Sequence, residues 1–159
     1  MKALVVSDTH RRNDNFLKVV EAVGAVDMVI HCGDVEGSEY LIEEAAGCPV
    51  KFVAGNNDFF TDLPMEDEFI FGKYRVWVTH GHNYYVSMTN EFLKQEAKDR
   101  GADIVLFGHT HKPVVDWGEG LVAVNPGSLS YPRQEGRRPS YVLMEIDREG
   151  EVHFTVCYV

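Results

Sequence analysis

Five short segments each carry an aspartate, an asparagine or a glycine, and four of them hold six of the seven histidines. The segments are Asp8–His10, His31–Asp34, Gly55–Asp58, His80–His82 and Gly108–His111. Together they offer carboxylates, imidazoles and an amide, with no cluster of thiolates. This set of donors is typical of sites for divalent ions such as Mn²⁺, Fe²⁺ or Zn²⁺, and it differs from the cysteine-rich sets of structural zinc.

Two of the segments hold donors that are two residues apart. Asp8 and His10 form one pair, and His109 and His111 form the other. Residues two apart in an extended chain point to the same side, so each pair can bind in one region. Asp34 directly follows a glycine, where a tight backbone lets its carboxylate reach inward. The spacing therefore predicts that donors from separate segments gather around metal ions.

Each of the five segments also contains or follows a short apolar run that is rich in β-branched residues. Such runs predict strands that are buried on both faces. Amphipathic helices are predicted over 16–23, 38–46 and 89–100, the last with Phe92 and Leu93 facing inward. Strands that alternate with helices indicate a largely parallel sheet, and ligands bind beyond the carboxyl ends of its strands. We therefore expect the five segments to meet at one edge of the fold.

From Glu68 onward the pattern changes from helices to hairpins. A Gly-Lys turn joins two strands within 69–76, and further strands are predicted over 121–125, 140–146 and 152–159. The sequence thus predicts an α/β fold in which two mixed β-sheets pack together, with helices outside. The length of 159 residues, without an internal repeat or a linker, indicates one domain.

Composition excludes several classes of protein. No apolar run approaches the ~20 residues that span a bilayer, and the first residues lack the apolar length of a secretory signal. Three scattered cysteines favour a reducing compartment. Fifteen lysines and arginines against 25 aspartates and glutamates give a net charge of −10, which disfavours duplex nucleic acid as a partner. We therefore expect a cytoplasmic protein that binds neither membranes nor duplex nucleic acid.

The order of these segments resembles the calcineurin-like metallophosphoesterases, and the resemblance covers nearly the whole chain. The matching motifs are Asp8-x-His10, Gly33-Asp34, Gly55-Asn56, His80 and Gly108-His109-x-His111. The Asn-Pro-Gly-Ser stretch at 125–128 and the small size are similar to the compact prokaryotic phosphodiesterase branch. The resemblance implies a four-layer αββα sandwich of two mixed β-sheets flanked by helices.

The resemblance also implies two divalent metal ions that are bridged by Asp34. The implied ligands of the first metal are Asp8, His10 and His111, and those of the second are Asn56, His80 and His109. Mn²⁺ is the metal that we expect, with Fe²⁺, Ni²⁺ and Zn²⁺ as alternatives. The implied activity is hydrolysis of small-molecule phosphodiesters by a hydroxide that bridges the two metals.

One segment departs from the pattern of the family. Many members carry Gly-Asn-His, in which the histidine assists the leaving oxygen, whereas Asn57 follows Asn56 here. An amide donates a hydrogen bond but supplies no proton as a general acid. His82 is the candidate for that catalytic role, and the alternative is that it orients a metal ligand.

Three residues are candidates for binding substrate, and each has a structural alternative. Asn57 either contacts the phosphoryl group or only packs against its neighbours. Arg11 either binds a substrate phosphate or lies on a solvated loop. Ser128 binds phosphate or shapes a turn. A basic patch over 133–138 carries three arginines, for which a soluble loop is the default interpretation and docking of an anionic substrate is the alternative.

The competing interpretation of function is a non-catalytic metal-binding scaffold or protein-interaction subunit. A retromer subunit is similar in fold and in its closing Asn-Pro-Gly-Ser sequence, without a competent site. Relatives of that subunit depart at several ligand positions, whereas this chain retains all seven, which favours an enzyme. The terminal strand 152–159, Tyr131 or the pair Phe59-Phe60 could form the face of a homodimer or higher homo-oligomer, with ordinary packing as the alternative.

Overall fold

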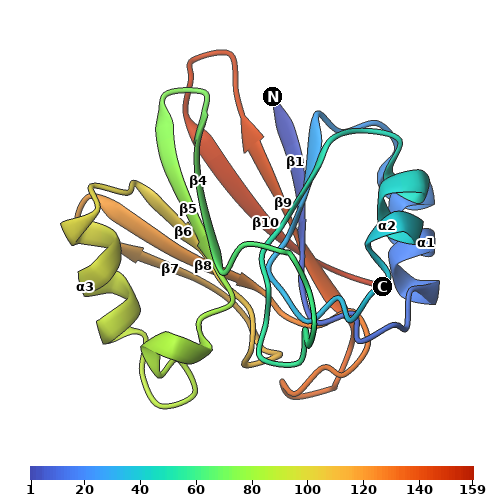
Figure 1. The fold of residues 1–159 in the computed structure, drawn as a ribbon. Helices are drawn as coiled ribbons and strands as arrows, with labels where there is room; N and C mark the ends of the chain where they lie inside the picture. The colour runs from blue at the N-terminus through green and yellow to red at the C-terminus, as the bar shows by residue number, and fades with distance from the viewer.

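The computed structural model describes residues 1–159 and contains ten strands in two sheets (Figure 1). The strands of the first sheet are β1 (Lys2–Val6), β2 (Met28–His31), β3 (Val50–Phe52), β9 (Ser140–Ile146) and β10 (Val152–Tyr158). Those of the second sheet are β4 (Glu66–Phe71), β5 (Tyr74–Thr79), β6 (Ile104–Leu106), β7 (Pro113–Gly118) and β8 (Leu121–Pro126). Their orders are β10-β9-β1-β2-β3 and β4-β5-β6-β8-β7.

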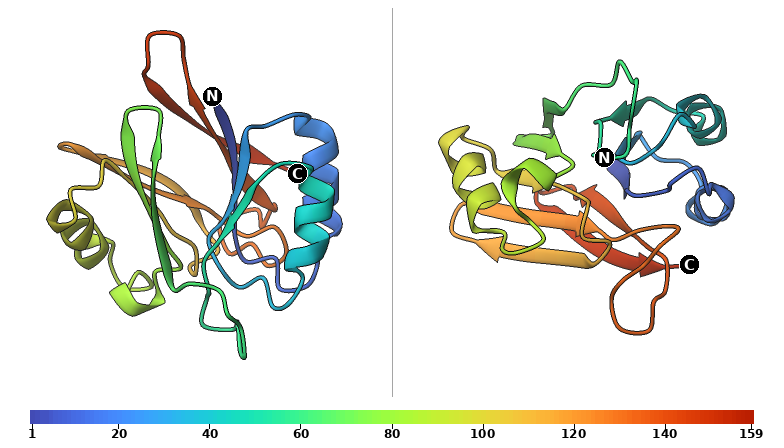
Figure 2. Two further views of the ribbon diagram at one scale, coloured as in Figure 1. Left: turned by 45° about the horizontal axis from the view of Figure 1, so that its top comes forward. Right: turned by 60° about the horizontal axis from the view of Figure 1, so that its bottom comes forward.

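Helices cover the outer faces of both sheets (Figures 1 and 2). Helices α1 (Asp14–Val23) and α2 (Glu39–Ala46) lie on the first sheet, and α3 (Glu91–Asp99) lies on the second, with a short 3₁₀ helix, η1 (His82–Tyr84), before it. The four-layer αββα sandwich predicted from the sequence is therefore confirmed. None of the helices is long and apolar enough to cross a membrane.

Three apolar clusters hold the layers together. Side chains such as Val5, Ile30 and Leu106 are buried between the two sheets. Phe16 of α1 packs into the cluster under the first pair of helices, and Leu93 of α3 packs into the cluster that lies on the second sheet. Each such buried side chain contributes about 1.5–3 kcal/mol relative to an exposed one. The strands that carry the candidate donors are therefore anchored on both faces.

The central strands of each sheet are parallel and the outer ones are antiparallel. Strands β1, β2 and β3 run parallel in the first sheet, and β5, β6 and β8 run parallel in the second. Their carboxyl ends point toward the lower edge of the view in Figure 1. Six strand ends therefore meet at one edge of the sandwich, where polar loops can approach one another.

The structure differs from the sequence-based expectation in two local features. Strand β7, which begins at Pro113, was not predicted; it lies at the sheet edge, where a proline is tolerated because no hydrogen bond from its nitrogen is needed. Phe92 was predicted to face inward, and this is wrong, since 59% of it is exposed. Leu93 and Ala97, which lie four residues apart on one face of α3, are the buried pair.

Candidate metal centre

Seven candidate donors lie in the loops that follow five parallel strands. Asp8 and His10 follow β1, Asp34 follows β2, Asn56 follows β3, His80 follows β5, and His109 and His111 follow β6. The structure brings all seven together at the edge where the two sheets meet. The carboxylate of Asp34 is central, because its Oδ2 atom lies 3.7 Å from His10 Nε2 and 3.5 Å from His80 Nε2.

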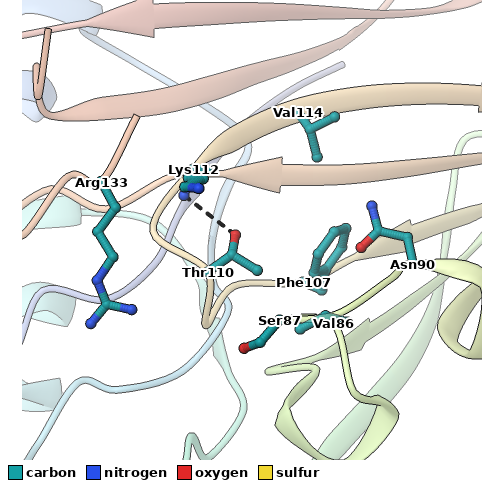
Figure 3. Close-up of a pocket in the computed structure, with 8 residues that line it drawn as sticks. All are labelled: Val86, Ser87, Asn90, Phe107, Thr110, Lys112, Val114 and Arg133. Carbon is teal, nitrogen blue, oxygen red and sulfur yellow. Dashed lines mark hydrogen bonds between the residues drawn. The ribbon is translucent and has the colours of Figure 1, made fainter. Parts of the chain in front are cut away.

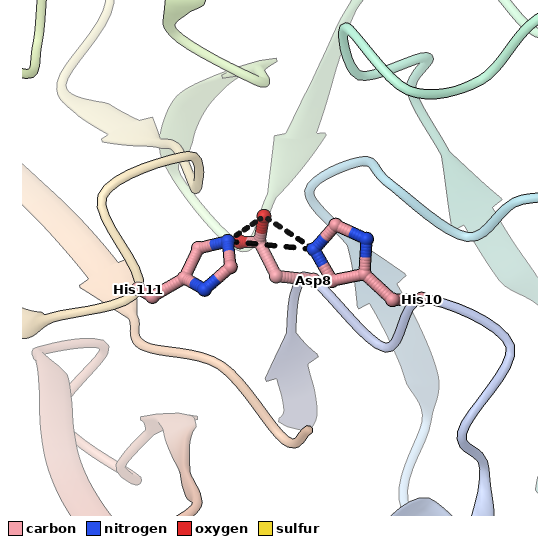
Figure 4. Close-up of side chains that lie close together, drawn as sticks. All are labelled: Asp8, His10 and His111. Carbon is pink, nitrogen blue, oxygen red and sulfur yellow. Dashed lines mark hydrogen bonds and ion pairs between the residues drawn. The ribbon is translucent and has the colours of Figure 1, made fainter. Parts of the chain in front are cut away.

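Asp8, His10 and His111 form the first group of donors (Figure 4). The Oδ1 atom of Asp8 lies 3.1 Å from His111 Nε2 and 3.8 Å from His10 Nε2, and the two imidazole nitrogens are 3.4 Å apart. This carboxylate oxygen is buried and has no hydrogen-bond partner. Leaving a buried polar atom unpaired costs about 1–3 kcal/mol, so the arrangement favours a cation at this point.

Asn56, His80 and His109 form the second group. The side-chain oxygen of Asn56 lies 3.1 Å from His80 Nε2 and 2.9 Å from His109 Nδ1. Asp8, Asp34 and His80 also come within metal-binding distance of one another. The two groups therefore share a boundary at the aspartates, and Asp34 faces both.

Three of the histidines are oriented by a bond on the far side of the ring. The Nδ1 atom of His80 is 2.7 Å from the carbonyl of Cys32, and that of His111 is 2.7 Å from the carbonyl of Tyr131. The Nδ1 atom of His10 is 2.6 Å from a carboxylate oxygen of Glu36. These oxygens only accept, so Nδ1 carries a proton and Nε2 is the atom that faces the centre, as in metal-binding histidines.

Burial divides the seven donors into two sets. The floor consists of the four that are at most 4% exposed, which are Asp8, Asp34, His80 and His111. The rim consists of the three that are partly or fully exposed, which are His10, Asn56 and His109. Both carboxylates belong to the floor, so the negative charge of the centre is shielded from solvent.

The floor residues shift one another's pKa values. Burial alone would raise the pKa of Asp8, but the nearby His80 and His111 outweigh it and lower that pKa. The pKa of Asp34 is lowered in the same way by His80 and Asn57, against burial. Burial lowers the pKa of His80, but Asp8 and Asp34 overcome this effect and raise it to about 9. The two aspartates thus stabilise positive charge at this point.

The backbone at the centre adopts torsion angles that L-residues rarely use. Five of the seven donors have positive φ angles, which are 53° at Asp8, 46° at His10, 59° at Asp34, 69° at His109 and 58° at His111. Such residues cost of order 1–3 kcal/mol each and gather at functional sites, where the surrounding structure enforces them. A Cβ atom at Gly55 would lie 2.1 Å from Asp34 Oδ1, so glycine is required for this close approach.

A family model described as calcineurin-like phosphoesterase superfamily domain matches residues 1–149. The chain belongs to this superfamily. It is 33% identical over 150 residues to the probable metallophosphoesterase YsnB of Bacillus subtilis, with 94% of this chain and 86% of that protein covered. It is 32% identical over 145 residues to a phosphodiesterase of Methanocaldococcus jannaschii, with 80% and 83% covered.

Solved structures show the same fold. A predicted phosphoesterase from Streptococcus pneumoniae has a TM-score of 0.78 at 29% identity, with 99% of this chain and 97% of that chain covered. Vps29 from Entamoeba histolytica, described as complexed with Zn²⁺, has a TM-score of 0.79 at 23% identity, with 99% of each chain covered. The second likeness concerns the fold alone.

The other candidate residues of this superfamily member lie around the donors. Both the backbone and the side-chain N–H of Asn57 donate to the Asp34 carboxylate, at 2.8 Å each. The ring of His82 lies 5.4 Å from that of His80, and burial together with the charge on His80 lowers the pKa of His82. Arg11 is 74% exposed, and its Nε donates to the carbonyl of Glu36 at 2.6 Å.

Ser128 lies behind Asp8. Its buried hydroxyl donates to the Asp8 carbonyl at 2.8 Å and accepts from the N–H of Ser130 and of Tyr131. The structure thus gives Ser128 three bonds within the protein, and these fix the loop and the strained backbone of Asp8.

Several supporting residues escaped the sequence analysis. Ser7 donates to Asp8 Oδ2 at 2.6 Å, and Glu36 orients His10. The carboxylate of Asp58 accepts the N–H groups of Asp34, Glu36 and Gly55. The spacing of Glu36, two residues after Asp34, is a signal that could have found it, whereas Ser7 carries none.

Proposed function

We propose that this phosphoesterase is a metal-dependent phosphodiesterase that hydrolyses small-molecule phosphodiesters with two divalent ions. The observation that supports this most is the buried Oδ1 atom of Asp8, which has no hydrogen-bond partner. Three Nε2 atoms converge on it, at 3.8 Å from His10, 3.9 Å from His80 and 3.1 Å from His111. Apolar or merely structural packing would leave these atoms unpaired, at a cost in free energy.

The residues fit two cations. Asp8, His10 and His111 would hold the first, and Asn56, His80 and His109 would hold the second. Asp34 would bridge them, because a single oxygen of its carboxylate lies at nearly equal distances from His10 and His80. Oxygen and nitrogen donors without sulfur suit Mn²⁺, which we propose as the metal.

Two divalent ions bound here would lower the pKa of a bound water and offset the charge of the phosphoryl oxygens. Asn57 positions the Asp34 carboxylate through two hydrogen bonds, and the second hydrogen of its amide is free to bind a phosphoryl oxygen. His82 stands beside His80 and His109, where its ring can donate a proton or a hydrogen bond to a leaving oxygen. Both roles are parts of the proposal.

Metal content and hydrolysis test this function together. The purified protein should contain about two equivalents of transition metal by mass spectrometry, as the two donor groups imply. It should hydrolyse bis(p-nitrophenyl) phosphate with Mn²⁺, lose that activity with EDTA, and act more slowly on p-nitrophenyl phosphate. A protein that binds two ions but hydrolyses no ester would overturn the proposal and favour the scaffold.

The scaffold is the second candidate function, and it rests on the shared fold and on exposed aromatic residues. Vps29 from Entamoeba histolytica is itself described as complexed with Zn²⁺, so metal binding alone does not separate the two functions. Phe59 and Phe60 lie exposed on the loop that follows Asp58. Such residues, together with Tyr131, are available for contact with a partner or a second copy.

The proposed location is the cytoplasm. Cys32, Cys48 and Cys157 are all free, and burial raises the pKa of the Cys32 thiol. Unpaired cysteines are typical of reducing compartments. Mass spectrometry of alkylated protein from cells tests this, since three free thiols are expected and an intermolecular disulfide would contradict the proposal.

A further inference from the structure

A cavity of about 540 Å³ opens directly beside the metal centre. The cavity is lined by His10 and His111, which are candidate metal ligands, and by Tyr131, Pro132, Arg133 and Arg137. Its volume lies within the usual range of ~300–1,000 Å³ for small-molecule sites. A molecule that occupies this cavity therefore lies beside two candidate metal ligands and two arginines.

The two arginines have no carboxylate partner. Neither Arg133 nor Arg137 has an acidic oxygen within 4.0 Å, whereas Arg100 pairs with three glutamates and Lys94 with Glu91 and Asp116. The protein carries a net charge of −10, so acidic groups are plentiful elsewhere. Exposed arginines often do no more than solvate a loop; these two differ in facing a cavity that leads to the centre.

The loop that carries the arginines is fastened to the metal centre. The N–H of Arg133 donates to the carbonyl of His111 at 3.0 Å, and the His111 ring donates to the carbonyl of Tyr131 at 2.7 Å. Tyr131 packs against the ring of His10, at 5.4 Å between ring centres, and the guanidinium carbon of Arg12 lies 4.8 Å from the centre of the Tyr131 ring. The base of Arg133 is therefore held at a fixed distance from the candidate ligands.

A second groove continues from the same arginine. It has a volume of about 370 Å³ and is lined by Arg133 and Lys112, with Phe107 and Thr110 among the remaining residues. Figure 3 shows Arg133 at one end of this groove and Asn90 at the other. Lys112 also has no carboxylate within 4.0 Å, since it takes part in none of the ion pairs. Positive charge thus continues along one side of the centre.

We propose that Arg133 and Arg137 form a subsite for a second phosphate group, so that the substrate is a small phosphodiester that carries an additional phosphate on one arm. This inference rests on the proposed function. Arginine suits the role because its planar guanidinium binds phosphate oxygens in pairs. The scissile phosphorus would lie at the metal centre, and the second phosphate would lie in the cavity beside Tyr131.

A matched pair of chromogenic esters tests the subsite. One is the p-nitrophenyl ester of thymidine 5′-phosphate, and the other is the same ester with a phosphate on the 3′ oxygen. The wild-type protein with Mn²⁺ should prefer the second in kcat/KM by about tenfold or more, because charge-assisted hydrogen bonds favour it. Arg133→Gln and Arg137→Gln should each lower this preference several-fold, and the double variant should abolish it.

Arg148→Gln is the matched control, since Arg148 is exposed on the β9–β10 turn and its substitution removes the same charge. The preference should be unchanged in that variant. A wild-type protein without preference would overturn the subsite, as would a double variant that retains the preference within twofold. Circular dichroism of each variant shows that the fold is intact.

Direct binding separates the failure of the subsite from the failure of the proposed function. If neither ester is hydrolysed, the proposed function fails, and calorimetry with thymidine 3′,5′-bisphosphate in the presence of EDTA still decides the subsite. The wild-type protein should bind the bisphosphate about tenfold more tightly than thymidine 5′-phosphate, since charged hydrogen bonds add to affinity. Equal affinities, or an unchanged affinity in the double variant, would refute the subsite.

Discussion

The floor and the rim of the metal centre are built differently. Each floor residue is fixed by bonds from another segment: Asp34 by the amide groups of Asn57, and His80 by the carbonyl of Cys32. On the rim, Glu36 fixes His10, whereas Asn56 contacts His109 and His80 through a single side-chain oxygen. We infer that the floor is already formed in the metal-free protein, while the Asn56 and His109 side of the rim is ordered by what binds to it. Preorganisation of this kind lowers the free-energy cost of binding.

Removing a floor carboxylate should have the largest effect. Asp34→Asn keeps the shape of the side chain but removes the charge that faces both groups of donors. We expect diester hydrolysis to fall by roughly a hundredfold to a thousandfold, together with loss of bound metal by mass spectrometry. His80→Ala should show the same losses of hydrolysis and bound metal. Asp62→Asn, at an exposed position, serves as the control.

A rim substitution completes that test. His109→Ala should lose less activity than His80→Ala and should recover part of it when the Mn²⁺ concentration is raised. Full activity in Asp34→Asn would contradict the role of the floor. A loss in His109→Ala that equals the loss in His80→Ala and resists added metal would contradict the distinction between floor and rim.

Removing the Ser128 hydroxyl, which bonds to the backbone of the floor residue Asp8, should have the next largest effect. Ser128→Ala removes a buried hydroxyl that makes three hydrogen bonds, one of them to the Asp8 carbonyl. We expect the free energy of unfolding to fall by about 2 kcal/mol, since the backbone groups are left unpaired. Urea denaturation measures this. Ser130→Ala, which removes one hydroxyl bond to the same carbonyl, should cost less. A raised KM with unchanged stability would instead make Ser128 a substrate-binding residue.

His82 is not a donor, but its ring lies beside the floor residue His80 and the rim residue His109. His82→Asn removes the only ring beside His80 and His109 that can serve as an acid without being a candidate metal ligand. We expect about a tenfold greater loss of kcat on an alkyl diester such as glycerophosphocholine than on bis(p-nitrophenyl) phosphate, as general acid catalysis matters most for poor leaving groups. Equal losses on both esters would remove His82 from this role.

The smallest expected effect concerns His31, which lies buried behind the floor. Gly33 N–H donates to its Nδ1, its Nε2 contacts Thr9, and burial lowers its pKa to about 4. Between pH 6.5 and 5 the unfolded chain therefore binds a proton that the folded protein does not, so stability falls as the pH falls. His80 adds little to this slope, because its pKa is about 9 in the folded protein and 6.5 in the unfolded chain, and well below pH 6.5 both states hold the proton. The stability that His80 contributes is lost as the pH rises from 6.5 to 9.

Urea unfolding of the metal-free protein measures that slope. The wild type should lose about 1 kcal/mol per pH unit below pH 6.5 from this single group, and His31→Gln should show a flatter dependence. His153→Gln, at the exposed end of the chain, is the matched control. An identical slope in the wild type and His31→Gln would show that the residue is not buried in its neutral form.

The floor could be predicted from the sequence because its residues directly follow buried strands. The predicted parallel sheet placed the strand ends that carry Asp8 and Asp34 at one edge, and the observed parallel pairing of β1 with β2 makes them neighbours. The bonds that support them could not be predicted in this way. Ser128 contacts Asp8 across 120 residues, and the carbonyl of Tyr131 meets His111 through a loop that has no periodic pattern. Such contacts depend on the packing of both sheets.

The fold also contains features that local sequence predicts and features that depend on long-range packing. The hairpin of β4 and β5 and the three helices follow from turn residues and apolar spacing, which act locally. Strand β7 was missed because Pro113 argues against a strand unless the strand lies at an edge, and its place at the edge is set by pairing with β8. Phe92 was misplaced because an aromatic residue next to the buried stripe of α3 resembles a core residue in sequence alone.

The positive φ angles of the five donors have an evolutionary consequence. They hold the backbone in torsions that only glycine adopts without cost, and selection for the reaction is what would keep bulkier residues there. A descendant released from that selection could replace these donors by glycine and become more stable. Loss of activity in such a lineage would therefore be favoured by folding itself, and the surface of the protein would remain available for other uses.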